Sequence, residues 1–290
     1  MVNVDFKTIY VNGDSWSAGD IVDPELFPDQ PWHVMHPDNK PYRTGRVWPK
    51  FLGDKLDVNI INNSHAGASN DRIVRTTVND ILGLVQEIDP SKLFVLIGWT
   101  SPERKDFFYD NGKDNRAWDT VYPAEFQHWK DENDLIRNDF YKNYVAGYWH
   151  KEEYLTRHIL NVLFISNFLD NLGIKYLFFD CFYEEYSKVV DPKEHQLLHD
   201  KKVHTQIETL HQGMLKGTTL RHVGINNSIE EYLSVYKKYF IKRTFAGHIR
   251  KIIEKKGPKY TQDYIDFHPT LLGHQEWANY LSRYVFRKCI

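Results

Sequence analysis

Residues 7–19 read KTIYVNGDSWSAG, and this stretch decides which fold we expect. Its first half is a short apolar run with the β-branched and aromatic residues that strands favour. Three similar runs follow along the chain, and none alternates strictly between apolar and polar residues. That pattern is typical of strands buried on both faces of a parallel sheet. The predicted strands are residues 7–12, 58–62, 93–98 and 175–182.

Amphipathic helical patterns separate these runs. One opens near Ser69, and a second covers residues 151–171 and is closed by Gly173. A third begins at Ser228 with a capping-box pattern, and the last follows Pro269. Strands that alternate with helices imply right-handed crossover connections. The predicted fold class is therefore α/β, a three-layer α/β/α sandwich with a central parallel sheet.

Two long segments, residues 105–150 and 183–257, do not fit this alternating pattern. The first is polar but rich in Trp, Tyr and Phe, and the second is rich in His and partly helical. Both follow the C-terminal ends of predicted strands, where α/β proteins keep their active sites. We interpret residues 1–290 as a single domain with two insertions that shape a substrate cleft. The alternative is that the insertions only extend the fold.

The composition argues against several classes of partner. A net charge of −2 gives no electrostatic reason to expect nucleic acid or an anionic membrane. Cys181 and Cys289 do not form a disulfide framework. The N-terminus lacks the pattern of a secretion signal, and no apolar stretch approaches the ~18 residues of a membrane span. We expect a cytoplasmic protein, and the sequence leaves its oligomeric state open.

The polar residues that follow the first predicted strand, residues 12–15 (NGDS), form a candidate nucleophile turn. Such a turn places the Ser15 hydroxyl at the edge of the sheet, where the backbone N–H of Ser15 also faces a developing oxyanion. The simpler interpretation is that Ser15 only caps the next helix, because turns are rich in these residues. Asp14 is interpreted as a structural turn residue.

A candidate base for this serine stands near the C-terminus, in residues 266–269 (DFHP). A serine nucleophile needs a base, and the base needs an acid that orients it. Pro269 biases His268 toward an extended conformation, in which residues i and i+2 point to the same side. Asp266 is therefore expected beside the His268 ring.

Three blocks in order resemble the SGNH (GDSL-type) hydrolase family: GDSWSAG at 13–19, NSHAGASN at 63–70 and DFHPTLLGH at 266–274. The resemblance implies a flavodoxin-like α/β/α fold and cleavage of esters, often acetyl or acyl groups on sugars or lipids, without a cofactor. It assigns Ser15 as nucleophile, His268 as general base and Asp266 as the orienting acid. It also implies that the backbone N–H of Gly67 joins that of Ser15 in the oxyanion hole.

The sequence departs from this family at two positions. The third block is usually Gly-x-Asn, but Thr100 stands where the Asn is expected, so the predicted oxyanion hole is Ser15, Gly67 and Thr100. Losing one oxyanion donor costs on the order of ~10²–10³ in rate, and Asn70 or Ser101 is an alternative donor. In the last block the usual spacing is Asp-x-x-His, and Ile265 occupies the Asp position. Asp263 is an alternative acid.

Three residues near this site are candidates for binding substrate: Asn70, Trp99 and Arg104. The competing interpretations are that Trp99 belongs to the core and that Arg104 pairs with Glu103 or solvent. A cluster of histidines, His195, His199 and His204, has helical spacing but no third ligand fixed by the sequence. We therefore expect neither a metal nor a cofactor.

Our first hypothesis is a carboxylic-ester hydrolase that acts through an acyl-enzyme on a small-molecule or carbohydrate ester. The second is a glycan-binding protein on the same fold that has lost efficient chemistry, suggested by Thr100 and by the aromatic residues 107–149. The third is an acyltransferase, which shares the acyl-enzyme and differs only in the acceptor.

Overall fold

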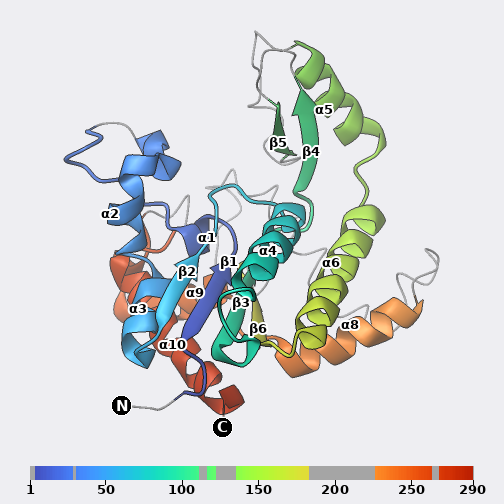
Figure 1. The fold of residues 1–290 in the computed structure, drawn as a ribbon. Helices are drawn as coiled ribbons and strands as arrows, with labels where there is room; N and C mark the ends of the chain where they lie inside the picture. The colour runs from blue at the N-terminus through green and yellow to red at the C-terminus, as the bar shows by residue number, and fades with distance from the viewer. Residues whose placement is uncertain are drawn as a thin grey trace.

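A computed structural model describes residues 4–28, 31–110, 116–121, 135–182, 226–262 and 268–289. A parallel four-stranded sheet lies at its centre, with the strand order β2-β1-β3-β6 (Figure 1). The strands are β1 (Thr8–Asn12), β2 (Asn59–Asn62), β3 (Leu93–Trp99) and β6 (Lys175–Asp180). All four overlap the predicted runs. The expected α/β class with a central parallel sheet is therefore confirmed.

The strands differ in burial according to their place in the sheet. β1, β3 and all but the first residue of β6 are buried, as expected for strands covered on both faces. β2 is at most partly buried, so the expectation of full burial is wrong for this strand. The physical reason is that β2 pairs only with β1, whereas β6, at the other edge of the sheet, is also bridged at Phe178 by Phe240.

Helices cover both faces of the sheet (Figure 1). Their bounds are α3 (Trp48–Leu56), α4 (Asn70–Leu84), α6 (Lys151–Asn171), α8 (Asn226–Tyr239), α9 (Phe245–Lys256) and α10 (Leu271–Cys289). One apolar cluster joins α4, α6 and α8 to the face of β1 that carries Tyr10. A second joins α3, α9 and α10 to the opposite face, which carries Ile9 and Val11. The alternation of side chains along β1 thus supplies both halves of the core.

Some of the helix ends predicted from the sequence agree with the structure, and one does not. Ser69 caps α4, because its hydroxyl accepts the backbone N–H of Arg72 at 3.1 Å. Gly173 follows α6 with φ of 69°, as a C-terminal glycine should. The predicted cap at Ser228 is wrong, because α8 already includes Asn226 and Ser228 lies inside its first turn.

The shorter elements are α1 (Ser15–Ala18), α2 (Lys40–Thr44) and single turns at Pro31–Met35, Pro37–Asn39, Pro90–Lys92 and Pro258–Tyr260.

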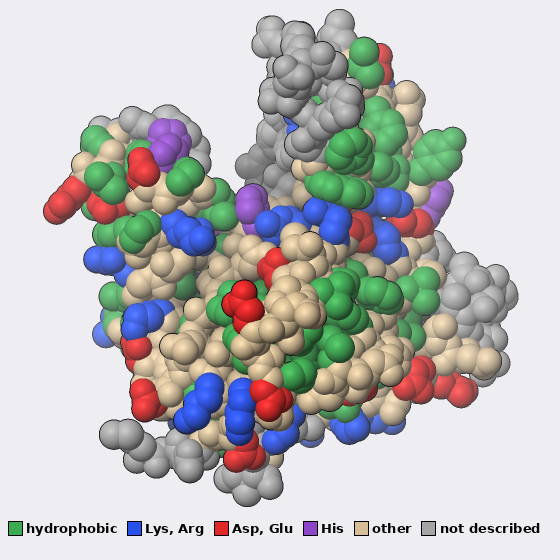
Figure 2. Space-filling model, in the orientation of Figure 1, with side chains coloured by type: hydrophobic (Ala, Val, Ile, Leu, Met, Phe, Trp, Pro, Cys, Tyr) green, Lys and Arg blue, Asp and Glu red, His purple; other side chains and the backbone are tan. Residues whose placement is uncertain are grey.

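The first insertion forms an arm that rises from the C-terminal end of β3 (Figure 1). It consists of the antiparallel hairpin β4 (Lys105–Asp110) and β5 (Arg116–Val121), followed by α5 (Leu135–Gly147). Figure 2 shows the surface hollowed between this arm and the segment around α2, with Lys and Arg side chains along the base of the arm. Of the second insertion, the structure describes α8 and α9, and residues 183–225 lie outside the described residues.

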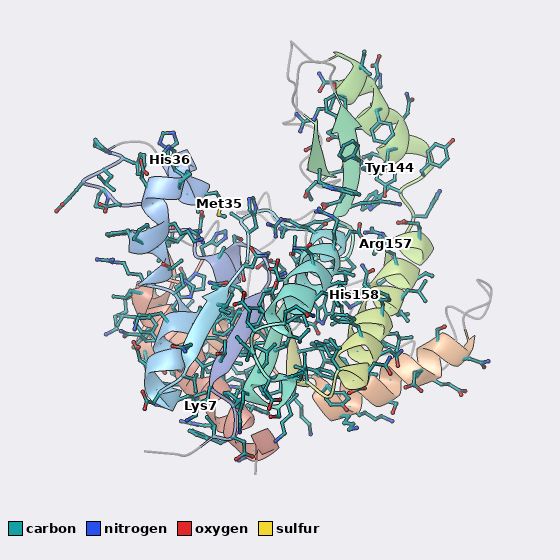
Figure 3. All side chains as sticks on the ribbon, in the orientation of Figure 1. Lys7, Met35, His36, Tyr144, Arg157 and His158 are labelled. Carbon is teal, nitrogen blue, oxygen red and sulfur yellow. The ribbon has the colours of Figure 1, made fainter. Side chains whose placement is uncertain are left out.

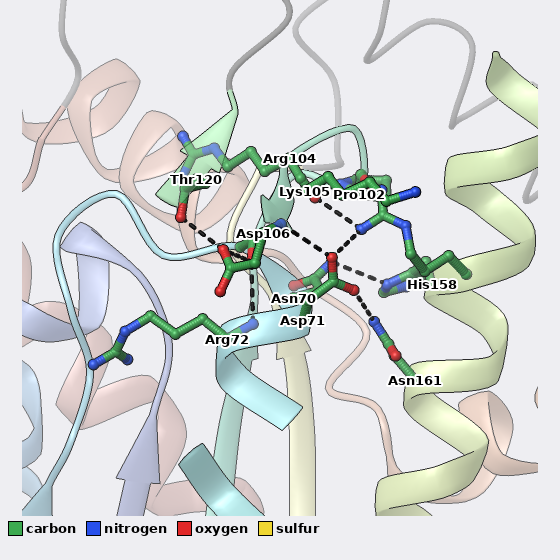
Figure 4. Close-up of polar contacts among 12 residues, drawn as sticks. Asn70, Asp71, Arg72, Pro102, Arg104, Lys105, Asp106, Thr120, His158 and Asn161 are labelled. Atoms are coloured by element: carbon green, nitrogen blue, oxygen red, sulfur yellow. Dashed lines mark hydrogen bonds and ion pairs between the residues drawn. The ribbon is translucent and has the colours of Figure 1, made fainter. Parts of the chain in front are cut away.

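Partly buried ion pairs connect the arm to the body of the molecule. Arg157 and His158 lie on the part of α6 nearest to the arm (Figure 3). Arg157 donates to Asp71 Oδ2 at 2.6 Å and to the carbonyls of Pro102 and Arg104, so it joins α6, α4 and the base of β4 (Figure 4).

A second carboxylate, that of Asp106 in β4, strengthens the same junction. It accepts hydrogen bonds from Ser69 at 2.6 Å and Thr120 at 2.7 Å, and from Arg75 at 2.8 Å. Because both carboxylates are fully engaged, the base of the arm is held in one position.

The helices of the described ranges reach at most 21 residues in length. None of them is long and apolar enough to cross a membrane.

Two buried histidines predict how stability depends on pH. Burial lowers the pKa of His274 to about 3 and that of His248 to about 4, from 6.5 in the unfolded chain. Below pH 6.5 these two histidines become protonated in the unfolded chain but stay neutral in the folded chain. The free energy of unfolding therefore keeps its full value above pH 6.5 and falls as the pH drops toward 4. We expect His274→Leu to reduce the slope of unfolding free energy against pH by about 1.4 kcal/mol per unit.

Urea denaturation of the wild type and of His274→Leu between pH 4.5 and 7 measures this slope. Equal slopes for the two proteins would contradict the assignment of a neutral, buried His274.

Candidate active site

Ser15 begins α1 directly after the turn that ends β1. The Asp14 carboxylate accepts the backbone N–H of Trp16 at 3.0 Å and caps this short helix. The interpretation of Asp14 as a structural turn residue is confirmed. Gly13 is required by close packing, since an added Cβ would lie 2.7 Å from Ser17 Oγ and 3.1 Å from the Gly98 carbonyl. These contacts fix the turn and leave the Ser15 side chain partly exposed.

His268 lies against this serine, although 253 positions separate them in the chain. Its Nε2 is 2.8 Å from Ser15 Oγ, which is within hydrogen-bond reach for a nucleophile and its base. The ring packs beside Trp16 at 5.9 Å between centroids. The backbone N–H of Gln262 donates to the His268 carbonyl at 2.8 Å, which anchors this segment. The two predicted residues are therefore brought together.

The carboxylate seen beside His268 is Asp20, a residue that the sequence did not single out. Asp20 Oδ2 lies 3.5 Å from His268 Nδ1, with 28% of the Asp20 side chain and 14% of the His268 side chain exposed. Gln262 Nε2 donates to the Asp20 carbonyl at 2.6 Å, and the backbone N–H of the same residue donates to the His268 carbonyl, so Gln262 links both segments. Asp266, the predicted acid, lies outside the described residues, as does Asp263.

The backbone conformation of Gly19 turns the chain so that Asp20 lies close to His268. Its φ of 86° is a left-handed conformation that favours glycine, and an added Cβ would collide with the Val47 side chain. The chain turns there and carries Asp20 back toward the histidine. The only signal in the sequence was an acidic residue one position after the block GDSWSAG.

The second block packs against the nucleophile turn. The backbone N–H of His65 donates to the Gly13 carbonyl at 3.0 Å, and Asn62 Nδ2 donates to the Ser17 carbonyl at 2.9 Å. Gly67 has φ of 77°, a turn conformation suited to glycine. The loop that carries Gly67 is thus bonded to the turn that carries Ser15, and the role of Gly67 as an oxyanion donor remains a prediction.

Thr100 lies beneath the same turn and binds Asp14. Its hydroxyl donates to Asp14 Oδ2 at 2.7 Å and accepts from Arg104 Nη1 at 2.9 Å, while Arg104 Nη1 is 3.8 Å from the same carboxylate oxygen. Burial raises the pKa of the Cys181 thiol, and its hydrogen bond to Asp14 raises this pKa further. Because a hydroxyl has one proton, Thr100 can donate to an oxyanion only by releasing Asp14.

The three predicted substrate-binding residues are placed differently. Asn70 is buried, and its amide exchanges two hydrogen bonds with the Thr100 backbone at 2.9 and 3.1 Å. Trp99 is fully buried and packs edge-on against His158 and Phe178, as the core interpretation holds. Arg104 keeps 17% of its side chain exposed, so it is the one of the three that faces solvent.

Positive charge gathers around the second block. Burial lowers the pKa of His65, and the nearby guanidinium groups of Arg72 and Arg43 lower it further. Arg43 is buried and donates to the Ala18 carbonyl at 2.5 Å, next to the nucleophile turn. His65 is therefore held in its neutral form at neutral pH, beside the guanidinium groups of Arg72 and Arg43.

In the parts of the chain that the structure describes, no group of three or more His, Cys, Asp or Glu side chains is placed to hold a metal ion. The predicted histidine cluster of His195, His199 and His204 lies outside these parts.

Comparisons with known proteins give a family and two distant structural likenesses. The chain is similar to a member of the lipolytic protein G-D-S-L family from Veillonella parvula DSM 2008, at 14% identity and a TM-score of 0.44, over 97% of this chain and 99% of that chain. It is also similar to a catalytic mutant of an acetylxylan esterase from Geobacillus stearothermophilus, at 11% identity and a TM-score of 0.46, over 98% and 95% of the two chains.

Neither likeness bears on which residues react, and no curated protein matches the chain. Residues 30–195 match the model of a family of unknown function, DUF6071. Because this match spans more than half of the chain, the protein belongs to that family.

Proposed function

We propose that this protein is a serine esterase of the SGNH type, which cleaves a carboxylic ester through an acyl-enzyme. The observation that carries the proposal is the 2.8 Å contact between Ser15 Oγ and His268 Nε2 at the C-terminal edge of a parallel sheet. Open α/β sheets bind their ligands at this edge. A serine hydroxyl next to a neutral imidazole becomes nucleophilic because the ring accepts its proton.

The reaction needs only groups of the chain and water. Ser15 Oγ attacks the ester carbonyl while His268 Nε2 takes the hydroxyl proton, and the tetrahedral intermediate carries a negative oxygen. His268 then gives the proton to the leaving alcohol, and the acyl group stays on Ser15. Water that gives a proton to His268 attacks this acyl-enzyme, and collapse of the second intermediate returns the proton to Ser15 and releases the acid.

The backbone N–H groups of Ser15 and Gly67 are the proposed donors to the oxyanion. Thr100 assists only if its hydroxyl turns away from Asp14, with which it hydrogen bonds at 2.7 Å. The two backbone N–H groups therefore carry most of the proposed stabilisation of the oxyanion.

A carboxylate on the far side of His268 completes the proposed triad by holding Nδ1–H and stabilising the imidazolium. Two residues are candidates: Asp266, from the sequence, and Asp20, whose Oδ2 is 3.5 Å from Nδ1. The proposed substrate is a small-molecule or carbohydrate ester, and no cofactor takes part.

The experiment that tests the proposal combines turnover with covalent labelling. Purified protein is expected to hydrolyse p-nitrophenyl acetate and to react with a fluorophosphonate probe, with the probe mapped to the peptide that contains Ser15 by mass spectrometry. Absence of both turnover and labelling refutes the esterase function. Labelling of a different serine refutes the assignment of Ser15.

A further inference from the structure

The arm contains a cavity of its own, apart from the Ser15–His268 pair. It has a volume of about 480 Å³, within the range of small-molecule sites. Lys105 and Phe107 of β4, Phe140 and Tyr144 of α5, Tyr148 after α5 and Glu153 of α6 line it. All of these side chains belong to described residues, and the fixed base of the arm holds β4 and α6 in place.

Aromatic rings form most of the wall. Phe107 packs edge-on against Phe140 at 4.8 Å and against Tyr144 at 4.9 Å. Phe140 and Tyr148 are 45% and 72% exposed, which is unusual for residues of this size. Exposed rings that border a cavity offer flat apolar faces to a ligand.

Two polar atoms of the lining residues carry hydrogen-bonding capacity that the described residues leave unused. Glu153 Oε1 accepts from Lys105 at 2.7 Å and from Arg157 at 3.2 Å, whereas Glu153 Oε2 has no partner in the described chain. The buried hydroxyl of Tyr144, 5% exposed as a residue, likewise has none among the described residues. Burial raises the pKa of Tyr144 to about 12, so this group remains a donor at neutral pH.

These features of the wall indicate which class of ligand fits the cavity. A buried polar atom without a partner is destabilising, and an alkyl or acyl chain would not relieve this cost because it offers no hydrogen bond. The charges of Lys105 and Arg157 are balanced by the carboxylates of Glu153 and Asp71, so the wall does not attract an ion of either sign. A neutral ring that bears hydroxyl groups satisfies both the acceptor and the donor and places its C–H face on the aromatic side chains.

We propose that this cavity on the arm is a saccharide-binding site that takes one or two residues of a neutral glycan. The site does not depend on the proposed esterase function. Saccharide binding there would give the aromatic side chains of the first insertion a function. The Ser15–His268 pair would remain available to act on an ester group carried by a neighbouring sugar of the same glycan.

Binding of xylohexaose, cellohexaose, N-acetylchitohexaose and maltohexaose by isothermal titration calorimetry tests the proposal. We expect at least one of the four to bind, and Tyr148→Ala and Phe140→Ala to weaken it by about tenfold or more, as loss of a buried aromatic contact predicts. Tyr144→Phe, which removes only the hydroxyl, is expected to weaken it about threefold to tenfold. These substitutions alter exposed rings or a single atom, so the fold is retained.

The matched control is Phe108→Ala. Phe108 neighbours Phe107 on β4, is 57% exposed and does not line the cavity, so this variant should bind like the wild type. Ser15→Ala should also bind like the wild type. Binding with no turnover of p-nitrophenyl acetate would leave the saccharide site standing while the esterase proposal fails.

Three outcomes overturn the saccharide site. The first is no binding of any of the four glycans at about 10 mM, the weak limit of specific recognition. The second is binding that Tyr148→Ala and Phe140→Ala leave unchanged, or that Ser15→Ala abolishes. The third is binding of decanoate in place of the glycans with no effect of Tyr144→Phe, which identifies an apolar ligand.

Discussion

Replacing Ser15 with alanine is expected to lower kcat/KM for p-nitrophenyl acetate by at least about 10³-fold and to abolish fluorophosphonate labelling. The reason is that the variant lacks the hydroxyl that lies 2.8 Å from His268 Nε2 and that we propose as the nucleophile. The turn itself should survive, because Asp14 caps α1 through the backbone of Trp16 and does not use the Ser15 side chain. The melting temperature should therefore stay close to that of the wild type.

The matched control for this variant is Ser17→Ala. Ser17 belongs to the same short helix, but its hydroxyl is buried against Gly13 and Gly98, away from His268. We expect this variant to retain activity within about threefold, as for a change that touches no reacting atom. Equal losses in the two variants would show that the helix, and not the Ser15 oxygen, is what activity needs.

Replacing Asp20 with asparagine is expected to lower kcat by about 10²–10⁴ with little change in KM, because the imidazole loses the carboxylate that fixes its tautomer. Asp20 is one of the two proposed positioning residues and would act through His268 Nδ1, which is 3.5 Å away. A carboxylate stabilises the protonated ring, so its removal should move the acidic limb of the kcat/KM profile to lower pH. Loss of folding alone would not move this limb.

Asp266→Asn and Asp23→Asn complete this comparison. Asp23 lies on the same loop as Asp20, caps the backbone N–H of Glu25 at 2.9 Å and serves as the matched control with wild-type kinetics expected. If Asp266→Asn causes the large loss and Asp20→Asn does not, the acid is the residue that the sequence identified. Large losses in both variants would mean that two carboxylates share the histidine.

The sequence was most informative where local signals decide the structure. Continuous apolar runs predicted the strands, and the Gly-Asp-Ser turn and the His-Pro pair predicted two side chains that meet at 2.8 Å. These predictions work because the carboxyl ends of parallel strands gather at one edge of the sheet, whatever lies between them.

Features that depend on how loops pack were not accessible in the same way. Asp20 reaches His268 through the left-handed turn at Gly19, which no periodic pattern encodes. The sequence placed Thr100 where an oxyanion donor belongs, but the hydroxyl binds Asp14, because a buried carboxylate demands partners. The hairpin of the arm was also missed, since its aromatic residues do not alternate with polar ones over a strand length.

The Asp14 carboxylate has a consequence for how the protein is made. Its partners come from far along the chain: Thr100 and Arg104 follow β3, and the Cys181 thiol follows β6. During synthesis Ser15 leaves the ribosome long before these residues exist, so its turn cannot yet be set in place. His268 arrives later still. A partly translated chain therefore carries the proposed nucleophile without its proposed base, and the proposed reactivity requires that nearly the whole chain has left the ribosome.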